Sequence, residues 1–498
     1  MAMRRIGTFK LQCNNPHVYL FLGYLIIIAG IITFPYFLTR KTPPGYIIGG
    51  DTLVHAAIAR GIYLGRNPFL DQTYNIYPNW YPFLYHIVVA SAAKATGMSI
   101  ETIMIAFQAF LAITMILVLF YVARGLWGAK AGVYAASLSL MLLGSHIYPN
   151  PKELAPLLGV LSIYFVLKRM YVPSGFLLGL AFWTHYAFTL PLVGLPILFA
   201  IVQKEKKNIL VPILAFLIFS PFVINAAVHS GRLPQIESIY NPWETDTLVN
   251  KLKSLLPPVY LVPFLVLSFL RWNRERDPLS GALFLLVGII AIARLFPELL
   301  QPFGVYIWSK RFVGMLRYIY TLLSAYGASG VELSTKRAST LLTVTMLLLV
   351  PLAGAVIFWD SVDNDQFVWI SEYDFSLYYP EEHFLEVSSW IWNNTERDDV
   401  IATSEEVGMV LNALTGRPIV ATLYGHGNTF IDNQKRREDL EQLFTSSCNR
   451  KKEIVARYDV KVIITEPFVY EHWNVTDIEC IAVPVYQIEN VTIWEVKE

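Results

Sequence analysis

The chain has 498 residues, of which 55% are hydrophobic and only 15% are charged, and its mean hydropathy is +0.46. Soluble proteins carry about 25% charged residues, so this composition excludes an ordinary soluble protein and indicates a membrane protein. The net charge of +1, with no long basic run, gives no reason to expect nucleic acid as a partner.

The first apolar run extends from Val18 to Leu38, which is longer than the apolar core of a signal peptide, and no small-residue cleavage site follows it. We therefore expect a retained span, with Arg4, Arg5 and Lys10 keeping the N-terminus in the cytoplasm. Apolar segments close to the roughly 20 residues that cross a bilayer recur along the chain. The eleven expected spans lie near 17–39, 100–123, 131–148, 154–171, 174–186, 187–203, 208–228, 257–272, 278–296, 312–330 and 338–359. With this count every inward turn carries Lys or Arg, as the positive-inside rule predicts.

One apolar segment is not counted as a crossing. Trp80 to Ala95 includes Pro82, His86 and Lys94, and a crossing here would place the later basic turns outside. We expect this segment to lie in, or re-enter, the outer interface, within a first external loop of residues 40–99. The segments 174–186 and 187–203 are short for spans, so the sequence leaves open whether they cross twice.

The composition changes at about residue 360, where apolar runs shorten and strand-like pieces alternate with helix-like ones. This change predicts a membrane domain over residues 1–359 and a C-terminal α/β domain over residues 360–498. The strands are expected at Val400–Thr403, Ile419–Thr422 and Val460–Thr465, and the helices at Glu381–Trp392 and Asn433–Phe444. An odd number of spans puts this domain outside. Three Asn-x-Thr sequons in it, at Asn393, Asn474 and Asn490, support that side, where Cys448 and Cys480 could pair.

The stretch Gly49-Gly50-Asp51-Thr52-Leu53-Val54-His55 comes where the chain first emerges from the membrane. Asp51 and His55 share one face if a helix begins at Asp51. A carboxylate and an imidazole held together can accept a proton or hold a metal ion. The alternative is that Asp51 only caps an interfacial helix and that His55 is a polar residue on its face.

Other ionisable residues gather on the same predicted side, which in an apolar protein indicates a site. Two prolines fix the turn of the second external loop, which holds His146, Lys152 and Glu153. We predict metal ligands and acceptor-contacting groups among these residues: Glu153, His55 and His185 as ligands, and His146, Lys152 and Tyr81 as acceptor or substrate contacts. Glu153 could instead serve only to begin a helix, and His185 only to stabilise a helix end.

Lys310 and Arg311 stand at the outer mouth of the expected span 312–330. A pair of cations at the interface can bind the phosphate of a lipid headgroup. Alternatively, the two side chains extend there only to keep their charges in water.

These residues together resemble the GT-C superfamily of polytopic glycosyltransferases, which take sugars from polyprenyl phosphates. Asp51 and His55 keep the offset of the first-loop motif of oligosaccharyltransferases, and Gly144-Ser145 followed by Glu153 matches one acid of their second-loop motif. Ser309-Lys310-Arg311-Phe312 looks like the Arg-Phe where a basic residue faces the lipid phosphate. The segments Val387–Trp392, Val400–Thr403 and Leu414–Pro418 resemble the outer domain of archaeal-type members. The Trp-Trp-Asp-Tyr-Gly peptide-binding motif is absent, which favours transfer of a single sugar.

The resemblance implies an α-helical polytopic enzyme that moves a sugar from a polyprenyl (dolichyl) phosphate to a glycan, lipid or protein acceptor on the extracytoplasmic face. Asp51 is then the expected general base of an inverting displacement. Arg311 and Lys310 are the expected donor-phosphate ligands, with Mn²⁺ or Mg²⁺ near Glu153.

Two other functions stay open, a transporter or flippase for a lipid-linked substrate and a non-catalytic membrane protein with an outer binding domain. Transporters usually show repeated halves and ionisable groups at the bilayer midplane, and neither is visible here. The sequence names neither the sugar nor the acceptor.

Overall fold

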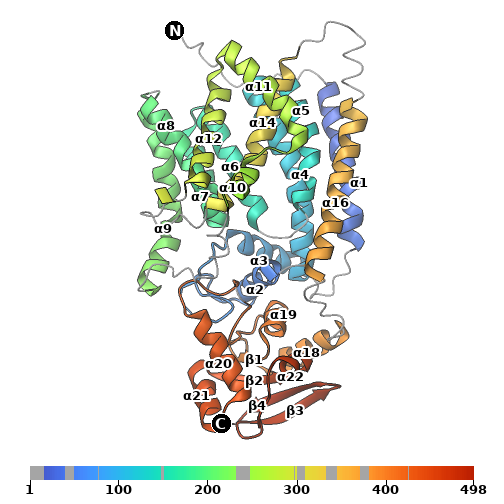
Figure 1. The fold of residues 1–498 in the computed structure, drawn as a ribbon, viewed down its shortest axis with the longest axis vertical. Helices are drawn as coiled ribbons and strands as arrows, with labels where there is room; N and C mark the ends of the chain where they lie inside the picture. The colour runs from blue at the N-terminus through green and yellow to red at the C-terminus, as the bar shows by residue number, and fades with distance from the viewer. Residues whose placement is uncertain are drawn as a thin grey trace.

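The computed structural model describes residues 16–39, 50–76, 78–146, 151–202, 204–230, 247–296, 298–299, 309–331, 345–370, 381–423 and 425–497. Figure 1 shows a bundle of long helices above a small C-terminal sheet, with two shorter helices, α2 and α3, between them. The bundle contains α1 (Pro16–Thr39), α4 (Ile100–Trp127), α5 (Ala129–Ser139), α6 (Leu154–Leu167), α7 (Tyr171–Thr189), α8 (Gly194–Val202), α9 (Leu210–Ser230), α10 (Leu248–Leu255), α11 (Val262–Glu275), α12 (Pro278–Leu295), α13 (Ser309–Phe312), α14 (Leu316–Ser329) and α16 (Val350–Ile370).

The bundle helices are apolar on their outward faces as well as at their contacts. Leu20, Ile27 and Ile31 of α1, and Leu217 and Val228 of α9, are exposed. Apolar faces of this extent require a nonaqueous surrounding, so the protein is a membrane protein. By length and hydropathy, five helices within the described ranges can cross a membrane, or six if the bent pair of α10 and Val259–Glu275 forms one span. The count of about eleven crossings and the orientation of the termini stay predictions.

The short segments 174–186 and 187–203 belong to one helical stretch, Tyr171–Ile201, which is long and apolar enough to cross a membrane. Its backbone leaves the helical conformation at His185, where φ is −163° and ψ is 88°. The stretch packs against α6 and α9. Whether it crosses the membrane twice stays open.

The helices α2 (Gly50–Tyr63) and α3 (Leu84–Thr96) lie between the bundle and the C-terminal sheet (Figure 1). At 13 residues α3 is too short to cross a bilayer, and it packs against α2, α4 and α7. It ends at Gly97, whose φ of +72° favours glycine. A helix within Trp80–Ala95 is confirmed, and its position at the membrane interface stays a prediction.

Residues 381–497, which we call the C-terminal unit, form a four-stranded sheet in the order β1-β2-β4-β3 with helices around it. Its elements are α18 (Glu381–Asn394), β1 (Val400–Ala402), α19 (Glu405–Thr415), α20 (Asn433–Thr445), α21 (Cys448–Tyr458), β2 (Val460–Thr465), α22 (Pro467–His472), β3 (Ala482–Ile488) and β4 (Val491–Val496). The expected strand Ile419–Thr422 is wrong, because only a single parallel bridge joins Ile419 to Ile401. The other two strands and both helices are confirmed. The expected domain boundary at 359/360 falls within α16 and stays a prediction.

The C-terminal unit and the loop between α1 and α4 share one apolar core. Buried side chains of α2, α3 and α4 cluster with those of α18, α19 and the sheet. α19 ends at Gly416, where φ is +70° and a Cβ would lie 2.8 Å from Leu64. Polar contacts join the same parts, since Ile419 N donates to Thr73 O at 2.9 Å and Arg66 Nη1 donates to Gly416 O at 2.6 Å. The loop is therefore fixed between the bundle and the C-terminal unit.

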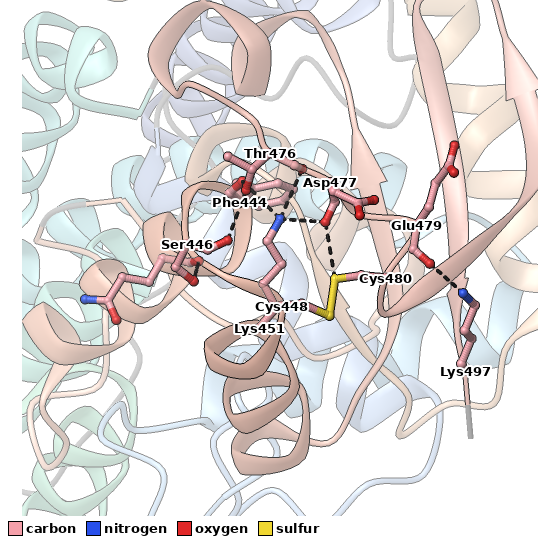
Figure 2. Close-up of a disulfide and its surroundings, with 10 residues drawn as sticks. Phe444, Ser446, Cys448, Lys451, Thr476, Asp477, Glu479, Cys480 and Lys497 are labelled. Carbon is pink, nitrogen blue, oxygen red and sulfur yellow. Dashed lines mark hydrogen bonds between the residues drawn. A yellow bond between two sulfur atoms is a disulfide. The ribbon is translucent and has the colours of Figure 1, made fainter.

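A disulfide joins Cys448 of α21 to Cys480, with their Cα atoms 6.0 Å apart, as the sequence allowed (Figure 2). Beside it the buried Lys451 ammonium donates to the carbonyl oxygens of Thr476 and Asp477, both at 3.0 Å. These contacts hold the segment before β3 against α21. A disulfide here is consistent with an extracytoplasmic C-terminal unit.

A half-buried carboxyl group, that of Glu405, lies where α19 begins, and a buried one, that of Glu466, lies where α22 begins. Burial raises the pKa of Glu466 to about 7, although Ser404 and the Phe468 amide, whose hydrogen bonds favour the charged form, oppose the shift. Burial and then the charge of Glu406 raise the pKa of Glu405 to about 7. These groups bind protons more tightly in the folded protein than in the unfolded chain, where a Glu pKa is about 4.3.

We therefore expect the contribution of these two groups to the stability of the C-terminal unit to be complete below about pH 4.3 and to be lost as the pH rises through about 7. Glu466→Gln removes one of the two ionisations. Between pH 5 and pH 8 the melting temperature of the full-length protein in detergent should fall. In the variant this fall should be smaller by several degrees. Glu438→Gln, an exposed position on α20, serves as the control. Parallel pH profiles for the Glu466 variant and the unmodified protein would contradict the expectation.

Candidate functional site

Asp51 stands in the first turn of α2, where the helix dipole favours a carboxylate. The face of α2 below it is buried, but the Asp51 side chain is 78% exposed. Its Oδ1 lies 3.5 Å from Nε2 of His426, which belongs to the C-terminal unit. The carboxylate is therefore open to a substrate while its backbone is held by packing.

One helical turn after Asp51, His55 pairs with His86 of α3, with His55 Nδ1 3.0 Å from His86 Nε2. Burial, followed by the charges of Arg311 and Lys152, lowers the pKa of His55 to about 3. Burial also holds the pKa of His86 well below its usual value. Both rings are thus neutral near pH 7, and one donates to the other. The predicted helix with Asp51 and His55 on one side is confirmed, and its partner His86 was not identified as a site residue from the sequence.

Tyr81 lies among the imidazole rings. Its ring centroid is 4.9 Å from that of His55, 5.8 Å from that of His86 and 5.6 Å from that of His185. The tyrosine ring therefore brings α2, α3 and α7 together at one point. This position is compatible with the predicted substrate contact.

Lys152 and Glu153 enter from the 3₁₀ turn Pro151–Glu153 that precedes α6. Burial lowers the pKa of Lys152, while the nearby carboxylates of Glu153 and Asp51 oppose the shift and Arg311 adds to it. Lys152 thus lies within electrostatic reach of both acids that the sequence predicted to converge. Its ammonium is also within electrostatic reach of the Arg311 guanidinium.

Glu153 is fully buried and already has strong partners. Arg317 Nη2 donates to both of its carboxylate oxygens, at 2.8 and 2.7 Å, and the Tyr318 hydroxyl donates at 2.9 Å. Both partners come from α14. The sequence signal for this contact was Arg317 itself, a basic residue in an otherwise apolar segment.

Arg311 of α13 donates from Nη1 to His185 Nε2, 3.1 Å away. The imidazole nitrogen that accepts this bond carries no proton, so His185 presents its proton on Nδ1. Arg311 is exposed, and its fork of N–H groups offers further donors beyond the one that His185 uses. Such a fork suits a phosphate.

The predicted metal ligands do not fit a divalent ion in this arrangement. Glu153 is held by Arg317 and Tyr318, His55 Nδ1 faces His86, and His185 Nε2 accepts from Arg311. Within the part of the chain that the structure describes, no group of three His, Cys, Asp or Glu side chains is placed to hold a metal. The reaction proposed below therefore uses no metal ion.

The side chains of His146 and Lys310 lie outside the described residues, so their predicted contacts with acceptor and donor phosphate stay predictions. His426 and Arg317 were not among the site residues predicted from the sequence. His426 stands between Gly425 and Gly427, and that glycine-flanked pattern was its only signal.

No protein-family model matches the chain, and no curated protein matches it by sequence. Solved structures of membrane glycosyltransferases do match its fold. The archaeal oligosaccharyltransferase AglB from Archaeoglobus fulgidus, in complex with an inhibitory peptide and a dolichol-phosphate, is 14% identical with a TM-score of 0.55, over 90% of this chain and 69% of that one.

ArnT from Cupriavidus metallidurans, bound to undecaprenyl phosphate, is 11% identical with a TM-score of 0.52, over 97% of this chain and 98% of that one. The arabinofuranosyltransferase AftD from Mycobacteria is 12% identical with a TM-score of 0.51, over 97% of this chain and 40% of that one. At these identities the similarity establishes the fold. The resemblance expected from the sequence is confirmed at that level, because the chain has the fold of the GT-C glycosyltransferases.

Proposed function

We propose that the protein is an integral-membrane glycosyltransferase that takes a sugar from a polyprenyl phosphate and passes it to an acceptor hydroxyl or amide. The observation that carries the proposal is the open Asp51 carboxylate within electrostatic reach of Lys152, which is itself within electrostatic reach of Arg311. It occurs in a fold whose solved members include AglB bound to a dolichol-phosphate and ArnT bound to undecaprenyl phosphate. A base and a cationic site are the two groups that such a transfer needs.

In the proposed reaction Asp51 takes the proton of the acceptor as the acceptor atom bonds to the anomeric carbon. The bond from that carbon to the phosphate oxygen breaks, and the lipid phosphate leaves with the electron pair. The attack comes from the face opposite the phosphate, so the anomeric configuration inverts. General-base assistance of this kind typically contributes about 10²–10⁴-fold.

The leaving phosphate gains negative charge, and the side chains that can stabilise it are Arg311 and Lys152. The neutral histidines cannot supply positive charge, because burial holds the pKa of His55 and of His86 far below 7. His185 instead fixes the guanidinium of Arg311. Fixed donors of this kind stabilise developing charge without reorganising during the reaction.

The metal ion that the sequence led us to expect is not part of this proposal. A solved complex of the Archaeoglobus fulgidus enzyme contains Zn and sulfate, and the sequence led us to expect Mn²⁺ or Mg²⁺. The described side chains of this protein instead place Arg317 on Glu153. We therefore assign Glu153 to the support of Arg317 and α14.

Asp51→Asn should retain the fold and the binding of polyprenyl phosphate but lower the rate of sugar transfer by at least 10²-fold, because an amide cannot accept the proton. The rate is measured as release of lipid phosphate from a panel of polyprenyl-phosphate sugars. Asp459→Asn is a matched control, since the Asp459 side chain is 79% exposed and is paired with Lys461. Unchanged transfer by the Asp51 variant would exclude this carboxylate as the base.

Arg311→Ala should weaken the binding of a polyprenyl phosphate by about 10–100-fold, because a hydrogen bond to a charged group is worth about 1.5–3 kcal/mol. Arg311→Lys should recover only part of this, since a lysine cannot form the same fork. Binding is measured by thermal shift at several lipid concentrations. The control is Arg274→Ala, whose side chain is exposed at the end of α11. Equal affinity in the two alanine variants would remove Arg311 from the phosphate site.

Glu153→Gln should lower the melting temperature by several degrees in metal-free buffer, because it leaves the Arg317 charge without its anion. Loss of one partner of a buried pair costs about 3–5 kcal/mol, an upper limit here because Gln keeps one acceptor. Glu453→Gln, in the exposed pair with Arg450, should change little. If Mn²⁺ raises the melting temperature of the unmodified protein and Glu153→Gln abolishes that rise, Glu153 is a metal ligand instead.

A further inference from the structure

His426 of the C-terminal unit lies in ion-pair range of Asp51. It belongs to the turn Gly425–Gly427, which we call the histidine turn. Its side chain is only 17% exposed, whereas that of Asp51 is 78% exposed. The histidine thus approaches the open carboxylate from a position that is itself enclosed.

Glycine is needed at both ends of the histidine turn. Gly425 has φ +86°, a conformation that other residues rarely adopt. A Cβ on Gly427 would lie 2.2 Å from Asn433 Oδ1, so a larger residue would displace the first residue of α20. The backbone of the turn is also closed by the His426 N–H, which donates to Leu423 O at 3.1 Å.

Buried amides attach the histidine turn to the loop between α1 and α4. Asn428, which is fully buried, donates from Nδ2 to Pro78 O at 2.8 Å. Asn433 donates from Nδ2 to Asn428 O at 2.7 Å, and the Tyr74 hydroxyl donates to Asn433 Oδ1 at 3.2 Å. Because Pro78 and Tyr74 belong to the same loop as Asp51, the position of His426 relative to Asp51 is set by buried contacts on both sides.

We infer that His426 is a positioning residue for Asp51, an inference that rests on the proposed function. Its Nε2–H donates to Asp51 Oδ1, which fixes the carboxylate and leaves Oδ2 to take the acceptor proton. The present separation of 3.5 Å is longer than a formed hydrogen bond, and contacts of this kind commonly shorten when the substrate binds. The C-terminal unit is then part of the catalytic centre.

The other charged or titratable groups around this contact cannot replace His426. His55 and His86 are occupied with each other and neutral. Lys152 and Arg311 lie within electrostatic reach of Asp51 or of its neighbours, but the proposed reaction uses their charges on the phosphate. An exposed carboxylate without a fixed donor samples several rotamers, and only some of them present an oxygen to the acceptor.

The kinetic test compares His426→Ala, His426→Gln and His426→Asn in the full-length protein. His426→Ala should lower kcat about 10–100-fold and leave the KM for the lipid donor unchanged within about twofold. The Gln variant should recover much of kcat, because its amide nitrogen can occupy the position of His Nε2. The Asn variant should not, since its shorter amide reaches only the position of Nδ1.

His472→Ala is the matched control, because His472 is an exposed histidine of the same unit whose Nδ1 lies 3.0 Å from Phe468 O of its own helix. Its kcat and KM should equal those of the unmodified protein. Full kcat in His426→Ala, or equal recovery by the Gln and Asn variants, would overturn the inference. Thermal melting of all four variants identifies any effect that arises from unfolding.

A second measurement tests the contact without activity. Cysteines replace Asp51 and His426 in a Cys13→Ser background, and a short thiol-to-thiol cross-linker is added. Mass spectrometry should find the peptide that joins positions 51 and 426, and its absence would overturn the inference.

If the unmodified protein transfers no sugar from any lipid donor although the cross-link forms, the proposed function fails, and the catalytic role of His426 is overturned with it. If the unmodified protein is active and His426→Ala is equally active, only the role of His426 fails.

Discussion

The packing of α2 between the helix bundle and the C-terminal unit is the constraint on which the candidate site depends. Its buried face joins α3, α4 and α19 in one apolar core. That core determines where the first turn of α2 points, and therefore where Asp51 lies. An apolar interface thus sets the position of the Asp51 backbone, and the His426 contact acts on the carboxylate itself.

The electrostatic character of the site follows from burial. Enclosed imidazoles lose their charge because desolvation favours the neutral form, as at His55 and His86. Arginine keeps its charge under the same conditions, so an arginine next to a neutral histidine, as at Arg311, is a stable way to present a cation to a lipid phosphate. The charge of Glu153 is balanced by Arg317, so among the described acids of the candidate site Asp51 is the one whose carboxylate is open.

Much of the fold and part of the site could be predicted from the sequence, because the signals involved are local. Apolar runs predicted the bundle helices, and alternating apolar pieces predicted β1 and β2 in the C-terminal unit. The i, i+4 spacing of Asp51 and His55 predicted one helix. Sorting residues by the side of the membrane brought Lys152, His185 and Arg311 to one region. The hydrogen bond between Arg311 and His185, and the pKa shifts that both Arg311 and Lys152 exert on His55, agree with that sorting.

The partners of these residues could not be predicted, because they come from segments far away in the chain. No residue near Glu153 in the sequence indicates that Arg317 forms an ion pair with it. A free carboxylate and a paired one therefore have the same local sequence pattern. The role of His426 is still harder to predict, because it depends on the position of the histidine turn. That position is set by a hydrogen bond between Asn428 and Pro78, which lie in two different parts of the molecule. Side-chain chemistry can be read from a local motif, but whether a charge is available for catalysis depends on the tertiary contact that satisfies it. In this protein that contact decides the assignment at both acids, because Arg317 withdraws Glu153 from the chemistry whereas His426 leaves one oxygen of Asp51 available for it.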